Sequence, residues 1–183
     1  MGTVNALSPK YGISSLLRGC ALVVEEDPTV PLHIRIAGKG PQEQELKRLA
    51  LKLGIAERIE WLGFVDISRV PDAWRSLDVA LIPSESESFG VSAVEAMACG
   101  IPVVITDIPG LMEATCPRAR VVVPRNNPDA IAHALLELYR NPELRHILGS
   151  EGREFVCAHL SLQACFERVE RSYLSALHGE NNA

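Results

Sequence analysis

Two glutamates stand out where a polar loop leads into a segment of small residues. Glu87 lies in the polar run 83–88, and Glu95 lies inside the alanine-rich segment that begins near Gly90. The first N–H groups of a helix starting there have no partner within the helix and carry the positive end of its dipole, which suits a diphosphate. A carboxylate on the apolar side of that helix needs hydrogen-bond donors, and two vicinal hydroxyls of a ribose or a hexose would supply them. The residues alone leave open that Glu95 pairs with a basic neighbour or faces solvent, and that Glu87 has no role beyond the loop.

Two further loops carry residues that could approach a phosphate. Lys10 stands two positions before Gly12, just ahead of a helical pattern, where a lysine can reach a phosphate or simply be a solvated loop residue. Gly38 and Gly40 begin like a dinucleotide fingerprint, but Glu43 stands where the third glycine belongs. This second pattern favours a tight turn with a close backbone approach.

The elements that must position these loops follow from the pattern of apolar residues. Short apolar runs without polar alternation predict strands buried on both faces, at 3–7, 32–37, 58–62, 79–82, 102–106 and 120–123. Helical patterns lie between and after them, at 13–26, 42–53, 68–76, 90–99 and 109–114. The fold class is therefore α/β, a Rossmann-like doubly wound parallel sheet of about six strands in one domain over residues 1–183. Ligands of such sheets bind beyond the carboxyl ends of the strands, where all three loops lie.

The last third of the chain changes to successive helices. Asn127 and Asn141 each precede a proline and an acidic residue, the order typical of an N-cap and a first helical turn. Ser161 is the expected cap of a last helix that runs to about residue 177. Residues 179–183 are expected to form a frayed tail.

Composition excludes several other functions. The 183 residues carry a formal net charge of −5, which argues against nucleic acid as a partner, and no apolar run approaches the roughly 20 residues of a membrane span. No phosphate-binding loop of the G-x-x-x-x-G-K-[ST] type, no D-x-D pair, no H-E-x-x-H and no G-x-S-x-G occurs. The odd number of scattered cysteines predicts a reducing, cytoplasmic location and no structural zinc: Cys20, Cys99, Cys116, Cys157 and Cys165.

The stretch PSESESFGVSAVEAMACGIPVV resembles the signature of retaining GT-B glycosyltransferases of the glycogen-synthase-like, group 1 family. Other stretches resemble the donor-binding, C-terminal Rossmann half of that family in the same order: LSPKYG, IAGKGP, IEWLGFV, SLDVALIPS and RNPELRHILGSEGRE. The resemblance implies a metal-independent transfer of a hexose, with retained configuration, from a nucleotide sugar to a polysaccharide or a lipid-linked acceptor. It implies no cofactor beyond this donor substrate.

The resemblance also implies roles for individual residues. Glu87 and Lys10 are the expected catalytic residues, because Glu87 would bind the transferred sugar and Lys10 would neutralise the diphosphate leaving group. Glu95 would accept hydrogen bonds from the ribose hydroxyls. The other expected donor-binding residues are Phe89, Gly90, Val91, Asn5 and Gly38.

The chain departs from the family pattern at two positions. Asn5 occupies the place where the family usually has Arg or Lys, and loss of that charge would cost roughly 1.5–3 kcal/mol of leaving-group stabilisation. In the loop at 108–113, Gly110 and Glu113 remain where a paired glycine is common, which we interpret as a minor change.

The chain is too short for the N-terminal domain of the family, which binds the acceptor. We therefore expect the isolated chain to bind donor weakly and catalyse little, and its last helix to leave an apolar patch exposed. Peripheral contact with a membrane remains open. The alternatives are a catalytically silent module that binds sugar nucleotides or recruits partners, and another GT-B enzyme such as a sugar-nucleotide epimerase or a pyridoxal-dependent phosphorylase.

Overall fold

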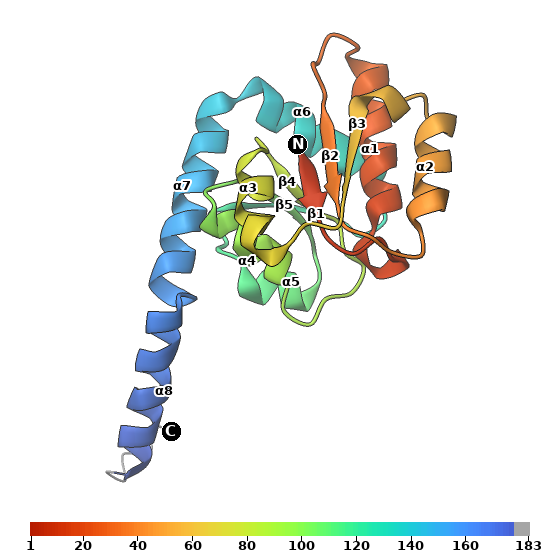
Figure 1. Cartoon of the computed structure of the whole chain (residues 1–183). Helices are drawn as coiled ribbons and strands as arrows, with labels where there is room; N and C mark the ends of the chain where they lie inside the picture. The colour runs from red at the N-terminus through yellow and green to blue at the C-terminus, as the bar shows by residue number, and fades with distance from the viewer. Residues whose placement is uncertain (178–183) are drawn as a thin grey trace.

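The computed structural model describes residues 1–177. Its centre is one sheet in which every neighbouring pair of strands is parallel, in the order β3-β2-β1-β4-β5-β6 (Figure 1). The strands are β1 (Gly2–Val4), β2 (Ile34–Ala37), β3 (Ile59–Gly63), β4 (Ala80–Ile82), β5 (Val103–Thr106) and β6 (Arg120–Val123). The predicted six-stranded, Rossmann-like doubly wound sheet is confirmed.

Burial of the central strands explains their uninterrupted apolar sequences. Every residue of β4 and of β5 is buried, because helices cover both faces of the sheet. The first strand is shorter than the predicted 3–7 and ends at Val4. Beyond it the Asn5 N–H still bonds the Ala37 carbonyl (2.9 Å), but the Asn5 side chain accepts the N–H of Ala6 (3.2 Å). This local bond helps turn the chain out of the sheet at the point where the first candidate loop begins.

The helices match the predicted segments to within one or two residues at most ends. They are α1 (Ile13–Glu26), α2 (Glu43–Lys52), α3 (Val70–Arg75), α4 (Val91–Ala98), α5 (Pro109–Ala114), α6 (Pro128–Arg140), α7 (Pro142–His159) and α8 (Leu162–Leu177). Three short 3-10 helices join them: η1 (Pro9–Tyr11), η2 (Ala56–Arg58) and η3 (Ile67–Arg69). The third replaces the start of the helix predicted at 68–76, whose α-helical part begins only at Val70.

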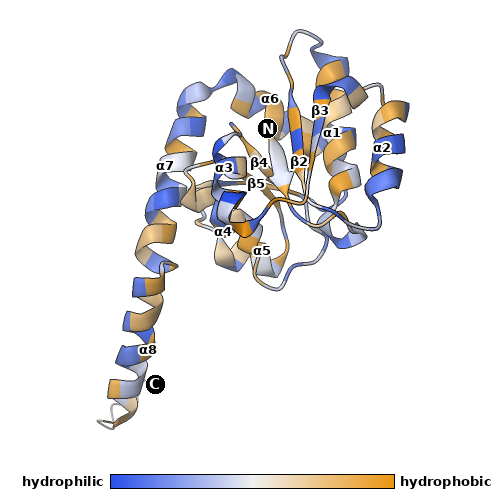
Figure 2. Cartoon of the chain, viewed as in Figure 1, coloured by the Kyte–Doolittle hydropathy of each residue, from blue (hydrophilic) through white to orange (hydrophobic). Residues whose placement is uncertain are grey.

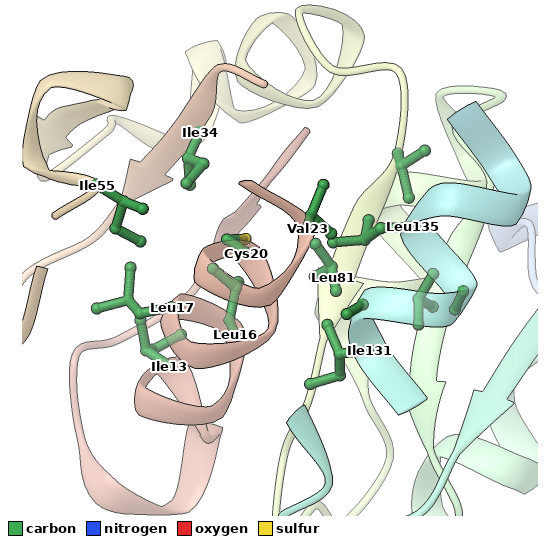
Figure 3. Packing of buried hydrophobic residues seen from close by; sticks show 14 of the residues in the cluster. Ile13, Leu16, Leu17, Cys20, Val23, Ile34, Ile55, Leu81, Ile131 and Leu135 are labelled. Carbon is green, nitrogen blue, oxygen red and sulfur yellow. The ribbon is translucent and has the colours of Figure 1, made fainter. Parts of the chain in front are cut away.

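Two apolar cores lie on opposite faces of the sheet. One joins α1, α2 and α6, and the other joins α3, α4, α5 and part of α7. Figure 3 shows the contact between α1 and α6, where Leu16 and Val23 face Ile131 and Leu135. A Cβ atom at Gly19 would lie only 2.6 Å from Ile131 Cγ2, so the backbone of α1 packs directly against a side chain of α6. This packing fixes the helix that follows the Lys10 loop.

The predicted caps of the C-terminal helices are confirmed. Asn127 Oδ1 accepts the N–H of Ala130 (3.0 Å), and Asn141 Oδ1 accepts the N–H of Leu144 (3.0 Å). Ser161 Oγ accepts the N–H of Ala164 (3.2 Å) and so begins α8.

The last helix extends away from the body and leaves an apolar face uncovered. Figure 1 shows α8 continuing beyond α7 and away from the sheet, and Figure 2 shows hydrophobic residues (orange) at intervals along its length. The predicted exposed patch is therefore present, and its large apolar members are Leu162, Phe166, Val169, Tyr173, Leu174 and Leu177. Leu162 and Leu177 are 75% and 80% exposed. None of the helices in residues 1–177 is both long and apolar enough to cross a membrane. The predicted tail at 179–183 lies outside the described residues.

Candidate active site

The candidate site lies at the carboxyl ends of β1 and β4, where the strand order reverses. From β1 the sheet runs outward through β2 and β3, and from β4 it runs outward through β5 and β6. Ligands of doubly wound sheets bind at such a switch point. The loop 5–12 follows β1 and the loop 83–90 follows β4, so the fold brings together the two segments that carry Lys10 and Glu87.

Backbone contacts tie these two loops to each other. The N–H of Glu85 donates to the carbonyl of Lys10 (2.7 Å). Gly12 has a φ of 63°, and a Cβ there would lie only 1.9 Å from the carbonyl oxygen of Pro83. A side chain at this position is therefore excluded both by the backbone angle and by space. The relative position of the two loops is fixed before any ligand arrives.

Lys10 lies on the surface of this loop with its side chain beside Tyr11. Its Nζ is 4.6 Å from the centroid of the Tyr11 ring. The contact with Tyr11 raises the pKa of Lys10, and the negative charge of Glu87 adds to the rise. The lysine therefore stays protonated, and the negative charge of Glu87 lies near enough to attract it.

Glu87 lies half-buried in the second loop, which contacts β5 and α5. The Ser84 carbonyl accepts a hydrogen bond from the buried Thr106 hydroxyl at the end of β5 (2.5 Å), and the Ser84 hydroxyl points to Glu87 Oε1 (3.5 Å). Gly110 of α5 packs against the same loop, since a Cβ there would lie 2.4 Å from the Glu87 carbonyl oxygen. Gly110, which the sequence analysis discussed only as part of a minor departure from the family pattern, thus supports the position of Glu87.

The amino-terminal end of α4 opens toward the same loops. Gly90 caps the helix with a φ of 82°, and no side chain bonds the first N–H groups. Phe89 and Val91 on either side are 47% and 59% exposed. Ser92 Oγ donates to the Val4 carbonyl at the end of β1 (3.2 Å), which fastens α4 to the first strand. The helix therefore presents unpaired N–H groups at the switch point, as an anion site requires.

Glu95, one turn further along α4, receives a hydrogen bond from a side chain of the neighbouring helix α3. Trp74 of α3 is fully buried, and its Nε1–H donates to Glu95 Oε2 at 3.2 Å. The alternative in which a basic neighbour pairs with Glu95 is wrong for the described residues, whose ion pairs within 4.0 Å do not include it. No local pattern signals the Trp74–Glu95 contact, since the two residues are 21 positions apart.

Gly38 allows a close approach between backbone segments, as its sequence pattern predicted. Its N–H bonds the Gly63 carbonyl (2.6 Å), and a Cβ at Gly38 would lie 1.8 Å from the Asn5 carbonyl oxygen. Gly40 lies just as close to Leu7, where a Cβ would be 2.2 Å from the carbonyl oxygen. These glycines hold the loop after β2 against the loop after β1, and contact of Gly38 with a donor stays a prediction.

One cavity lies beside the candidate site, and another lies far from it. A polar hollow of about 450 Å³ lies beside it, past the ends of β4, β5 and β6, lined by Glu85, Asp107, Pro124, Arg125 and Asn126. Another of about 450 Å³ lies at the opposite, amino-terminal edge of the sheet, where Met1, His33 and Asp78 are among the lining residues. The second is remote from the loops that carry Lys10 and Glu87. Within residues 1–177, no three His, Cys, Asp or Glu side chains gather in a way that could hold a metal ion.

Comparison with known proteins assigns this arrangement to a family. The family model of the group 1 glycosyl transferases matches residues 1–155. The chain belongs to the group 1 glycosyltransferases. The resemblance seen in the sequence is thereby confirmed at the level of the family, while retention of configuration stays a prediction.

Individual relatives of this group 1 glycosyltransferase are considerably longer. D-inositol 3-phosphate glycosyltransferase 2 of Catenulispora acidiphila is 35% identical over 147 residues, which cover 76% of this chain and 34% of the relative. The chain spans between 33% and 44% of the first three curated relatives that it matches.

Solved structures share the fold. Anabaena HepE in complex with UDP superposes with a TM-score of 0.85 at 20% identity, over 95% of this chain and 48% of that chain. The C-terminal domain of a Francisella tularensis group 1 glycosyl transferase superposes with a TM-score of 0.78 at 21% identity, over 88% of this chain and 85% of that chain.

Proposed function

We propose that this chain is the donor-binding half of a retaining glycosyltransferase that transfers a hexose from a nucleotide sugar. The observation that carries the proposal is the position of Lys10, Glu87 and the first turn of α4 at the switch point of the sheet, where no side chain bonds the first N–H groups of the helix. A cation and unpaired N–H groups there suit a diphosphate, and a carboxylate beside them suits sugar hydroxyls. The UDP held by Anabaena HepE, which has the same fold, supports a nucleotide ligand.

The proposed chemistry assigns one task to each group. Glu87 accepts hydrogen bonds from hydroxyls of the transferred sugar, and the backbone of Phe89, Gly90 and Val91 contacts sugar and phosphate. The bond from the anomeric carbon to the diphosphate oxygen breaks as a bond forms to the acceptor oxygen on the same face of the sugar. The acceptor proton passes to the departing phosphate, whose charge Lys10 and the helix N-terminus stabilise. This scheme uses no metal and no cofactor.

The nucleoside end of the donor is assigned to Glu95. Its carboxylate lies near the start of α4, where the ribose of a nucleotide would follow the diphosphate, and it accepts hydrogen bonds from the two ribose hydroxyls. Each such charge-assisted bond contributes about 1.5–3 kcal/mol, or roughly 10- to 150-fold in affinity.

The acceptor is assigned to a second domain outside this chain. The exposed apolar face of α8 and the greater length of the relatives support a partner domain that covers α8 and binds a glycan or a lipid-linked acceptor.

The five cysteines are all free thiols, which supports a reducing, cytoplasmic location.

Calorimetric titration of the chain with UDP, GDP, ADP and their glucose or mannose forms tests the proposal. We expect saturable binding of one nucleotide series that the Glu95→Ala variant loses by at least tenfold. Glu137→Ala, at an exposed position of α6 remote from the loops, is the matched control and keeps the wild-type affinity. Absence of binding at millimolar ligand, in a chain that unfolds cooperatively, would instead support a silent or partner-recruiting module. The neutral Asn5 favours that second candidate.

A further inference from the structure

We propose that Trp74 is a positioning residue that orients the carboxylate of Glu95 for the ribose hydroxyls. The inference rests on the proposed function, because it assumes that Glu95 binds a nucleotide. Its basis is the hydrogen bond from Trp74 Nε1–H to Glu95 Oε2 (3.2 Å), which joins α3 to α4.

The surroundings of Trp74 make this bond rigid. The indole is fully buried in the core formed by α3, α4 and α5, where Ala93, Ala96 and Met97 of α4 belong to the same cluster. An indole N–H is a donor only, and burial without an acceptor costs free energy. Glu95 Oε2 is that acceptor, so the packing that fixes the ring also fixes the carboxylate.

The bond leaves Glu95 free to bind a ligand. A carboxylate offers about four lone-pair positions, and Trp74 occupies one of them. Two vicinal hydroxyls can therefore donate to the rest. Within residues 1–177, Trp74 is the only side chain with a hydrogen bond or an ion pair to Glu95. Because a rigid donor holds one oxygen of Glu95, the carboxylate samples fewer orientations, which lowers the entropy lost when the ribose binds.

The test compares ligands that do and do not carry the hydroxyls. UDP, GDP and ADP are each titrated beside their 2′,3′-dideoxy forms into wild type, Trp74→Phe, Glu95→Ala and the double variant. We expect Trp74→Phe to lower the affinity for the ribonucleotide about tenfold and the affinity for the dideoxy form less than twofold. In the Glu95→Ala background the same substitution should cause less than a twofold further loss. Trp61→Phe, in β3, is the matched control and leaves both affinities unchanged.

The possible outcomes distinguish a failure of the proposed role of Trp74 from a failure of the proposed ribose binding by Glu95. Equal losses for both ligands in Trp74→Phe, or an undiminished loss in the Glu95→Ala background, would make Trp74 a core residue only. A wild-type protein that binds both ligands equally, or neither, would contradict the ribose role of Glu95 itself.

A second measurement avoids any change in the core. In the ¹⁵N spectrum of the wild type, the indole N–H signal of Trp74 should shift when the ribonucleotide binds and stay in place with the dideoxy form. The signal of Trp61 provides the internal reference. An unmoved Trp74 signal with saturating ribonucleotide would overturn the proposal.

Discussion

Gly110→Ala tests whether Glu87 contacts the transferred sugar, because Gly110 packs beneath the loop that carries Glu87. An added Cβ would lie 2.4 Å from the Glu87 carbonyl oxygen and 2.9 Å from the carbonyl of Ser88. Cβ contacts do not occur below 3.0 Å, so moving from 2.4 to 3.0 Å requires a retreat of about 0.6 Å. The Ser84 Oγ to Glu87 Oε1 contact, already 3.5 Å, would be lost.

We expect Gly110→Ala to weaken only the binding of the sugar part of the donor. Misplacement of a catalytic group by about 1 Å can lower a reaction rate about 100-fold, and by analogy we expect this smaller movement to lower the affinity for the sugar about tenfold, or by about 1.4 kcal/mol. The loss should fall on the extra affinity of the nucleotide sugar over the nucleotide alone. Binding of the nucleotide alone should change less than threefold, since Glu95, the proposed ribose ligand, is held by Trp74 of α3 and not by the loop that carries Glu87. Parallel calorimetric titrations of UDP, GDP and ADP and their glucose or mannose forms measure this ratio.

Gly149→Ala is the control for loss of stability. A Cβ at Gly149 would lie 2.2 Å from the carbonyl oxygen of Gly100, a similar clash at the opposite end of α4. Each variant should lose about 1–3 kcal/mol of unfolding free energy, but only Gly110→Ala should lower the sugar-dependent ratio. A folded Gly110→Ala protein with the wild-type ratio would refute the assignment of Glu87 to the sugar.

Three further predictions concern charge, protonation and the last helix. Asn5→Lys should strengthen nucleoside diphosphate binding about tenfold at low salt, with the gain shrinking as salt rises, and an unchanged affinity would mean that this position does not face a phosphate. Burial raises the pKa of Cys20 to about 12 from 9.0 in the unfolded chain. The folded form therefore holds its proton longer, and stability should fall as pH rises from 9 to 12, by on the order of 1 kcal/mol at pH 10 relative to pH 8. Denaturant titrations of wild type and Cys20→Ala should differ by this pH-dependent amount, and parallel pH profiles would contradict the burial argument. Leu162→Lys and Tyr173→Lys should each change the unfolding free energy of this chain by less than about 0.5 kcal/mol, because both side chains are largely exposed. A larger loss in chemical denaturation would mean that the face is packed in solution.

The architecture was readable from the sequence because its signals are local. Non-alternating apolar runs mark strands buried on both faces, and Asn127, Asn141 and Ser161 each precede a helix that they cap. The end of β1 was misjudged because Leu7 continues the apolar run, whereas the chain has left the sheet at Asn5. The pattern of apolar residues cannot detect such a departure, since a local side-chain hydrogen bond that helps to turn the chain leaves no mark on that pattern.

The sequence predicted which loops form the candidate site, but it did not predict the contacts that support them. Glu87 and Glu95 flank the start of one helix, so their relation follows from spacing along the chain. The support beneath them comes from other segments: Thr106 and Gly110 hold the loop, and Trp74 reaches Glu95. These contacts depend on how α3, α4 and α5 pack over the sheet, which no sequence pattern specifies.

The separation of α8 from the body makes this chain two cooperative units rather than one. A 16-residue helix with little packing against the rest is marginally stable in water, so its amide hydrogens should exchange well before those of β4 and β5. Both tryptophans, Trp61 and Trp74, belong to the body, whereas far-ultraviolet circular dichroism also registers α8. Unfolding curves followed by fluorescence and by dichroism should therefore not coincide. A protease that cuts near Ser161 should release α8 and leave a fragment that retains every loop of the candidate site.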